Sequence, residues 1–198
     1  MKTYEIKLTF TEPLLGTVPK DPEVYKTHVM NRAAVDDAQA AEELDTVEKV
    51  EEKGWTGFHR MNGTPILYDY VIKGFFKDAC SMLRRAGDTK SAKLAAFKKV
   101  IDGLIFAQPR MIELLVPEGK EIFTLERPLR ASTPQGERVA LARSDACPVG
   151  TTIIFKVLVL GSVTKAQLEE WLDYGKLRGL GQWRNAGYGA FEYALAKA

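Results

Sequence analysis

The residues best suited to chemistry lie near the C-terminus, in the stretch GLGQWRNAGYGAFEY from Gly179 to Tyr193. Its glycines are Gly179, Gly181, Gly187 and Gly189. Glycine lets the backbone approach a polyanion closely with its N–H groups exposed. Within this loop, Arg184 could contact a phosphate and Trp183 could stack on a base. The segment therefore predicts a nucleic-acid contact that involves Gly181, Trp183, Arg184 and Asn185.

A structural explanation of the same segment stays open. Glycine is the default residue where a tight connection needs positive φ angles. Arg184 could form a salt bridge inside the loop, and Trp183 could cap the core. The segment is not a mononucleotide P-loop, because it lacks GK[ST]. It also differs from a dinucleotide-binding GxGxxG, because its glycines follow a predicted helix and precede a strand.

The two histidines, His28 and His59, are the candidates for cleavage chemistry. Metal-independent RNA cleavage needs a base of near-neutral pKa to remove the 2′-OH proton, and a cation to stabilise the phosphorane. Tyr25 and Lys26 lie close to His28, and Arg60 follows His59. An ordinary surface or core position is the alternative for each histidine. We therefore predict a protein without catalytic residues and keep cleavage as the alternative.

The charge is unevenly distributed, although the formal net charge is only +2. Residues 36–52 are mostly acidic, whereas the balance turns basic over residues 73–99. A near-neutral sum can therefore hide a basic face. We predict that the acidic run is the solvated face of a helix. A clustered acidic surface can also bind a basic groove, as nucleic-acid mimics do.

Neither a metal nor another cofactor is predicted. The two cysteines, Cys80 and Cys147, form no CxxC motif and no cluster with histidine. Cys80 lies in an apolar helical pattern and is predicted to be a small core residue. The sequence begins without a signal-peptide pattern, and no apolar run is long enough for a membrane span. We therefore expect a cytoplasmic protein with reduced thiols and no membrane partner.

The elements that must position these residues follow from apolar periodicity. Alternation predicts a first strand over residues 3–10, and Asn62-Gly63 predicts the turn of a hairpin within residues 55–70. Helices are predicted over residues 71–86, 91–106 and 165–177. Further strands are predicted over residues 110–119, 120–132, 137–146, 151–160 and 188–195.

This order predicts an α+β fold with a ferredoxin-like or RNA-recognition-type core. We expect one domain over residues 1–198. It would carry an inserted acidic, helical segment over residues 22–53 and a β-hairpin extension. Arg130 and Arg138 lie on that hairpin. They could contact RNA, or they could be exposed strand residues that discourage edge pairing.

Three stretches of the chain resemble the RAMP superfamily of CRISPR-associated RNA-binding proteins. The family's glycine-rich loop follows a helix, leads into the final strand and has a pattern like GxGxxRxxGYGxF. In this chain the pattern runs from Gly179 to Phe191. LTFTEPLLG, over residues 8–16, is similar to the family's first strand and its exit. GTPILYDYVIKGFFKDA, over residues 63–79, is similar to its entry into a helix through "IKG". The run at residues 36–52 departs from any pattern in that family.

The resemblance implies a ferredoxin-like core that grips RNA through backbone contacts. Carried over to this chain, it implies that Lys73, Lys77 and Arg184 contact phosphate. It also implies that Arg130 and Arg138 lie on a thumb-like or finger-like hairpin. The alternative for Lys73 and Lys77 is the solvated side of an ordinary helix.

We therefore predict a RAMP-like RNA-binding protein that associates with copies of itself or with CRISPR effector subunits. The short length and the unusual insertion fit a phage-borne or solitary relative. Two alternatives stay open. One is a metal-independent endoribonuclease of the same superfamily. The other is a phage-encoded interaction protein that mimics an effector subunit and blocks assembly without RNA of its own.

Overall fold

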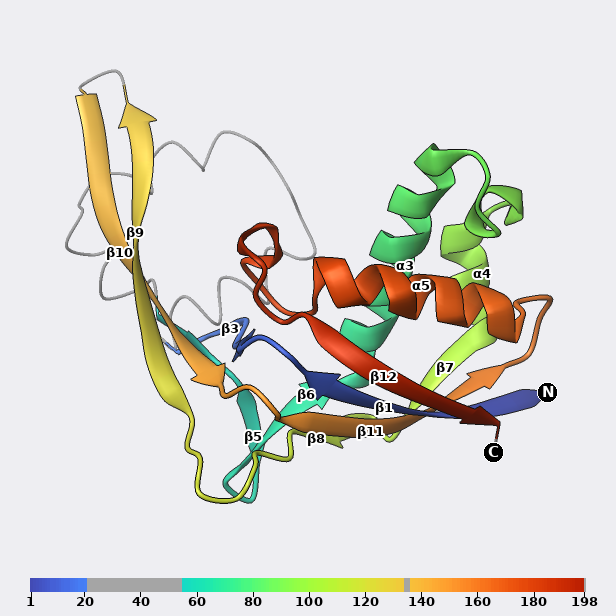
Figure 1. Ribbon diagram of the computed structural model, residues 1–198, viewed down its shortest axis with the longest axis horizontal. Helices are drawn as coiled ribbons and strands as arrows, with labels where there is room; N and C mark the ends of the chain where they lie inside the picture. Colours follow the sequence, from blue (N-terminus) through green and yellow to red (C-terminus); the bar gives the residue numbers. More distant parts are fainter. Residues whose placement is uncertain (21–54, 134–135, 198) are drawn as a thin grey trace.

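A four-stranded antiparallel sheet forms the centre of the protein (Figure 1). The computed structural model describes the backbone of residues 1–20, 55–133 and 136–197. It also describes the side chains of these residues, except those of residues 129–140. The predicted helical insertion over residues 22–53 lies outside the described residues. The strands of the central sheet, in their spatial order, are β12 (Phe191–Lys197), β1 (Lys2–Phe10), β11 (Thr152–Val159) and β7 (Ile105–Gln108).

Two helices, α3 (Asp69–Leu83) and α5 (Lys165–Arg178), lie on the same face of this sheet (Figure 1). A shorter helix, α4 (Phe97–Leu104), packs beside α3. The chain order β1–α3–β7–β11–α5–β12, with β1 and β11 in the middle of the sheet, is the βαββαβ arrangement of a ferredoxin-like fold. The predicted α+β, ferredoxin-like core is confirmed.

The core lies between the sheet and these helices because alternate residues of each strand point toward them. In β1, Tyr4, Ile6, Leu8 and Phe10 are buried, as the alternation in the sequence predicts. Trp171 of α5 is fully buried and donates a hydrogen bond from Nε1 to Ser91 Oγ at 2.9 Å. Each large apolar side chain buried here contributes about 1.5–3 kcal/mol to folding.

The helix ends follow local sequence signals. Thr164 and Gln167 form a capping box at the start of α5, in which each satisfies a backbone N–H of the other. At its C-terminal end, α3 continues into a 3₁₀ turn, η2 (Arg84–Ala86), and Gly87 follows with a φ of 74°. The helix predicted over residues 71–86 is thus confirmed.

The second predicted helix, over residues 91–106, is only partly correct. The structure has a 3₁₀ turn, η3 (Ser91–Lys93), then α4, and Ile105 already begins strand β7. Ile105 and Ala107 are buried while Phe106 is exposed, which is the alternation of a strand. Pairing with β11 therefore overrides the local helical pattern.

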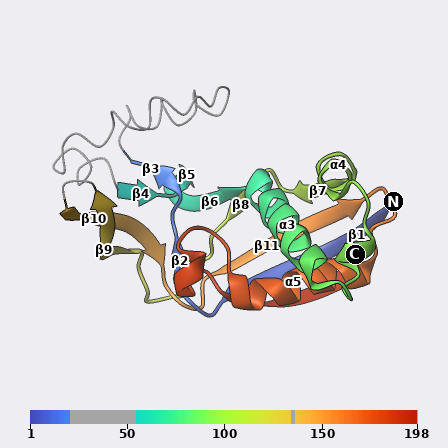
Figure 2. The same cartoon turned by 90° about the horizontal axis from the view of Figure 1, so that it is seen from above.

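A long hairpin of β9 (Phe123–Thr133) and β10 (Gly136–Cys147) projects from the core (Figures 1 and 2). The final residues of β10 turn back into the molecule, where they pair with short strands. These are β2 (Leu14–Leu15) and β4 (Trp55–Gly57), and β4 pairs in turn with β3 (Val18–Pro19). The predicted hairpin extension is confirmed, and its base is joined to the N-terminal part of the chain.

A third, small sheet lies beside the entry into α3. It consists of β5 (His59–Met61), β6 (Thr64–Tyr68) and β8 (Met111–Glu113). Asn62 and Gly63 join β5 to β6 with φ angles of 51° and 86°. Both angles lie in the left-handed region that Asn-Gly turns favour, so the predicted hairpin is confirmed.

Both cysteines are buried. Cys80 is part of the core cluster, as predicted, and burial raises the pKa of its thiol. Burial raises the pKa of Cys147 to about 12. Neither thiol is therefore suited to nucleophilic chemistry near neutral pH.

The contact between α5 and β12 makes a stability prediction. A Cβ at Gly175 would overlap the ring of Phe191 and lie 2.7 Å from Phe75 Cζ. Gly175→Ala should therefore lower the free energy of unfolding by about 1–3 kcal/mol through overpacking. Urea denaturation followed by circular dichroism measures this change.

The matched control is Gly74→Ala in α3. Gly74 is exposed, and nothing lies within 4 Å of its Cβ position. This substitution should raise the free energy of unfolding by about 0.5–1 kcal/mol, because alanine has the higher helix propensity. Equal effects of the two substitutions would contradict the packing that we describe.

Candidate functional site

The glycine-rich segment closes on itself between α5 and β12. Leu180 N donates to Gly189 O at 2.9 Å, and Gly189 N donates to Pro13 O at 2.9 Å. Gly179 and Gly189 have positive φ angles, and a Cβ at either position would overlap the backbone of the opposite arm. A Cβ at Gly181 would lie 2.9 Å from Leu15 O. These glycines are thus needed for a tight connection, which was the structural alternative for this loop.

Trp183, in the glycine loop, contacts strand β9 of the hairpin. The guanidinium carbon of Arg127, on β9, lies 3.2 Å from the centroid of the Trp183 ring. Tyr188 packs edge-on against the same indole, with ring centroids 6.1 Å apart. Trp183 has a φ of 55°, a conformation that a bulky residue adopts only when its surroundings hold it. One face of the indole is therefore occupied by an arginine.

Two further arginines converge on one carboxylate of α3. Arg184 Nη1 lies 2.7 Å from Asp78 Oδ2, and Arg178 Nε lies 3.7 Å from the same oxygen. Arg178 also donates to the side-chain oxygen of Asn185, which holds the exposed loop tip. The predicted salt bridge of Arg184 exists, but it reaches α3 rather than another loop residue.

We call Arg127, Arg178 and Arg184 the arginine cluster. Arg127 forms no ion pair within the described residues, and the other two share Asp78. Three positive and one negative formal charge leave an excess of two positive charges around Trp183. Each of these arginine side chains is partly exposed. The cluster can therefore accept an anion from solvent.

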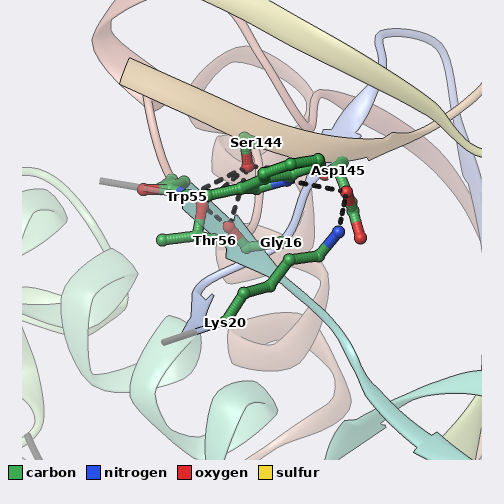
Figure 3. Close-up of polar contacts among 7 residues, drawn as sticks. Gly16, Lys20, Trp55, Thr56, Ser144 and Asp145 are labelled. Atoms are coloured by element: carbon green, nitrogen blue, oxygen red, sulfur yellow. Dashed lines mark hydrogen bonds and ion pairs between the residues drawn. The ribbon is translucent and has the colours of Figure 1, made fainter. Parts of the chain in front are cut away.

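A buried polar network joins the end of β10 to the short strands near it (Figure 3). Asp145 of β10 is only 7% exposed, and its Oδ1 accepts from Lys20 Nζ at 2.7 Å and from Trp55 Nε1 at 3.0 Å. Lys20 Nζ also lies 4.0 Å from the centroid of a Trp55 ring. Because a buried charge is costly unless it is paired, this network ties β10 to β4 and to the end of β3.

Gln182 connects the glycine loop to the same network. Its side-chain nitrogen donates to Gly16 O, to Thr56 Oγ1 and to Ser144 Oγ, the last at 3.1 Å. Thr56 Oγ1 and Ser144 Oγ are themselves 2.9 Å apart. The loop tip and the hairpin root are thus held in one arrangement, and this fixes the arginine cluster.

Sequence reasoning missed most of this site. Arg127 and Arg178 were visible only as members of basic stretches, and Asp78 and Gln182 carried no motif. The one available signal was Asp145, a charged residue between Ser144 and Ala146 in a strand that ends in the core. A buried acid in such a position requires a donor, but the sequence does not identify Lys20 and Trp55.

Lys73 and Lys77 lie on α3 but turn toward α4. Lys77 Nζ is 2.8 Å from Asp102 Oδ1, and Lys73 Nζ donates to the backbone oxygen of Asp102 at 3.2 Å. Lys73 Nζ also lies 4.6 Å from the centroid of the Phe106 ring. The structure therefore does not bring these lysines into the arginine cluster, and their predicted phosphate contact stays a prediction.

Arg130 and Arg138 lie on the outer part of the hairpin. In the register of β9 and β10, Arg130 pairs with Val139 and Arg138 pairs with Ala131. Their side chains lie outside the described ones, so the predicted RNA contacts of both stay predictions.

His59 is half-buried in the small sheet. Its ring packs edge-on against Tyr68, with centroids 4.8 Å apart, and Tyr68 stacks on the exposed Tyr70. Burial lowers the pKa of His59, which favours the neutral imidazole at pH 7. The neighbouring Arg60 donates to Gly63 O at 2.8 Å, within the hairpin turn. His28 lies outside the described residues.

The open face of the central sheet is poorly suited to base stacking. RNA-recognition modules stack bases on aromatic side chains of their sheet. Here the aromatic residues of β1 and β11, which are Tyr4, Phe10 and Phe155, are buried. The register instead places Glu5 opposite Lys156, both exposed. The core thus resembles such modules in topology but does not present their stacking surface.

Among the described residues, no group of three or more His, Cys, Asp or Glu side chains is arranged to hold a metal ion. The described helices are at most 15 residues long, and none has the length and apolar character of a bilayer span.

Known proteins resemble this chain in fold but not in sequence. No protein-family model and no curated protein matches the sequence. A chain in the cryo-EM structure of the type III-B Cmr-beta complex bound to cognate target RNA matches with a TM-score of 0.54 and 12% identity. The match covers 99% of this chain but only 61% of that one, so the protein spans about three fifths of its length. This likeness shows that the two chains share a fold.

Two further structures are more distant. A chain of a type IV-B CRISPR complex matches with a TM-score of 0.45 and 10% identity, over 98% of this chain and 90% of that one. Oligomeric Cmr4 from Pyrococcus furiosus matches with a TM-score of 0.48 and 10% identity, over 100% and 99% of the respective chains.

The buried network makes a stability prediction. Asp145→Asn removes the charge that pairs with Lys20, and it should lower the free energy of unfolding by about 2 kcal/mol, since hydrogen bonds to charged groups contribute ~1.5–3 kcal/mol. Asp102→Asn breaks the exposed pair with Lys77 and should cost less than about 1 kcal/mol. Urea titrations of both variants measure the difference, and equal values would show that the network does not hold the hairpin root.

Proposed function

We propose that this protein binds RNA without cleaving it, and that the RNA phosphate backbone lies against the arginine cluster. The observation that carries the proposal is the excess positive charge where the glycine loop meets the hairpin root. Arg178 and Arg184 share the single carboxylate of Asp78 there, and Arg127 stacks on Trp183 of the same loop. Planar guanidinium groups bind phosphate with two parallel N–H donors, so this arrangement suits a nucleic-acid backbone.

The arginine cluster is better suited to bind RNA phosphates than to recognise RNA bases. Arg127 covers one face of Trp183, and this leaves at most the other face of the indole for a base. A guanidinium stacked on an aromatic ring still presents its in-plane N–H groups. Such contacts position a nucleic acid but carry no direct sequence information. The proposed binding is therefore largely independent of RNA sequence.

The fold adds support from outside the site. The structure with the shared fold is described as a Cmr-beta complex bound to cognate target RNA. By this analogy, which concerns fold alone, we propose that the present chain assembles with copies of itself or with CRISPR effector subunits along an RNA. Light scattering of the protein with and without a long single-stranded RNA measures that assembly.

Two substitutions with opposite expected effects on RNA affinity test the arginine cluster. Asp78→Asn removes the carboxylate that neutralises Arg178 and Arg184, and should increase the affinity for a 20-nucleotide single-stranded RNA by about threefold to tenfold. Arg127→Ala removes one phosphate contact and should lower the affinity by a similar factor. It should also reduce the slope of log K against log salt by about 0.7. Fluorescence anisotropy at several salt concentrations measures both effects.

Lys165→Ala is the control for a lost surface cation, because Lys165 pairs with Glu169 at the start of α5. It should change the affinity by less than about twofold. If Asp78→Asn only lowers stability and leaves RNA binding unchanged, the arginines hold the loop and do not contact RNA.

The second test concerns cleavage. We expect a labelled RNA hairpin to stay intact after prolonged incubation with the protein, because the half-buried ring of His59 packs edge-on against Tyr68, which limits the access of a scissile phosphate. Denaturing electrophoresis measures the product. Cleavage that disappears in His59→Gln or in His28→Gln would instead support the endoribonuclease alternative.

A further inference from the structure

A second concentration of positive charge lies at the far end of α3. Residues from the end of α3, from η2 and from the start of α4 line a shallow hollow of about 530 Å³. Its lining is Ser81, Arg84, Arg85, Ala96, Phe97, Lys98 and Lys99. We call it the basic hollow. It lies at the end of the molecule away from the β9–β10 hairpin (Figures 1 and 2).

The cations of the basic hollow are uncompensated. Arg84, Arg85, Lys98 and Lys99 form no ion pair with any described residue, and the lining contains no acid. Elsewhere on α3, Lys77 is paired with Asp102 of α4, and Asp78 is paired with Arg184 of the glycine loop. Four like charges around one hollow repel one another and raise the local positive potential.

One of these cations is held in place by the protein itself. Arg84 Nη1 donates to Leu94 O at 2.5 Å, and its guanidinium carbon lies 5.1 Å from the centroid of the Phe97 ring. Arg84 and Phe97 are half-buried, whereas Arg85, Lys98 and Lys99 are exposed. The hollow thus combines one guanidinium that the protein holds in place with three exposed cations, so at least one donor is already positioned when an anion binds.

We propose that the basic hollow is a phosphate-binding site, separate from the arginine cluster. It takes two or more phosphate groups, either from a nucleic-acid strand or from a free polyphosphate such as a nucleoside triphosphate. Phosphate suits it because each group brings a high density of negative charge and several acceptor oxygens to a small space. The volume lies within the range of small-molecule sites.

The test uses the triple variant Arg85→Ala/Lys98→Ala/Lys99→Ala, which leaves the half-buried Arg84 and Phe97 in place. The matched control is Lys7→Ala/Lys120→Ala/Lys156→Ala, which removes the same charge from exposed positions on other surfaces. Calorimetry with inorganic tripolyphosphate and anisotropy with a 20-nucleotide single-stranded RNA are compared for both variants and the unchanged protein. Circular dichroism confirms that each variant is folded.

The phosphate groups come from a nucleic-acid strand if the triple variant loses about tenfold in RNA affinity while the control changes little. The slope of log K against log salt should then also fall by about two. The phosphate groups come from a free polyphosphate if the triple variant binds tripolyphosphate at least tenfold more weakly and binds RNA unchanged. The proposal is overturned if the triple variant and the control behave alike with both probes. Because tripolyphosphate binding needs no RNA, this result is independent of the outcome at the arginine cluster.

Discussion

The close approach of Leu180 and Gly189 is the constraint on which the rest of the structure depends. Their hydrogen bond, and that from Gly189 to Pro13, close the loop between the last helix and the last strand. Side chains at Gly179 and Gly189 would prevent this approach. Once the loop is closed, Gln182, Trp183 and Arg184 have fixed positions. Gln182 then meets the hairpin root, Trp183 meets Arg127, and Arg184 meets Asp78.

The structural and functional explanations of the glycine loop therefore do not exclude each other. The glycines themselves are explained by backbone packing. The side chains that they carry to the surface bring Arg184 to Asp78 and Trp183 to Arg127, and our proposal assigns a charged ligand to this group. Aromatic and cationic groups share the site, and Trp183 holds Arg127 in place. In our proposal, this tryptophan acts on RNA through the arginine that it positions.

Much of the fold could be predicted from the sequence because its signals are local. The alternation in residues 3–10, the capping box at Thr164 and the Asn62-Gly63 turn each determine an element without help from distant residues. The boundary at Ile105 could not be predicted, because pairing with β11 decides it. The site was harder for the same reason. Arg184 is recognisable from its motif, whereas its partner Asp78 lies 106 positions away in the chain.

Charge pairing distinguishes the cations of the basic stretch over residues 73–99 from one another. Lys77 pairs with the carboxylate of Asp102, whereas Lys73 donates only to the backbone oxygen of that residue. The phosphate contacts predicted for both lysines stay predictions. Arg84, Arg85, Lys98 and Lys99 belong to the same basic stretch, and the fold brings them together without an acid. Local composition counts cations, whereas tertiary structure decides which of them are neutralised.

The length of the β9–β10 hairpin gives its root a mechanical importance. Thr124 pairs with Asp145, and β9 runs nine residues further, from Leu125 to Thr133. At about 3.4 Å per residue, this makes an arm of roughly 31 Å. A rotation of about 5° at the root would move the tip by roughly 3 Å, about the length of one hydrogen bond. The buried contacts of Asp145 with Lys20 and Trp55 lie at that pivot. Their stiffness therefore sets how precisely the far end of the arm can be aimed at whatever it touches.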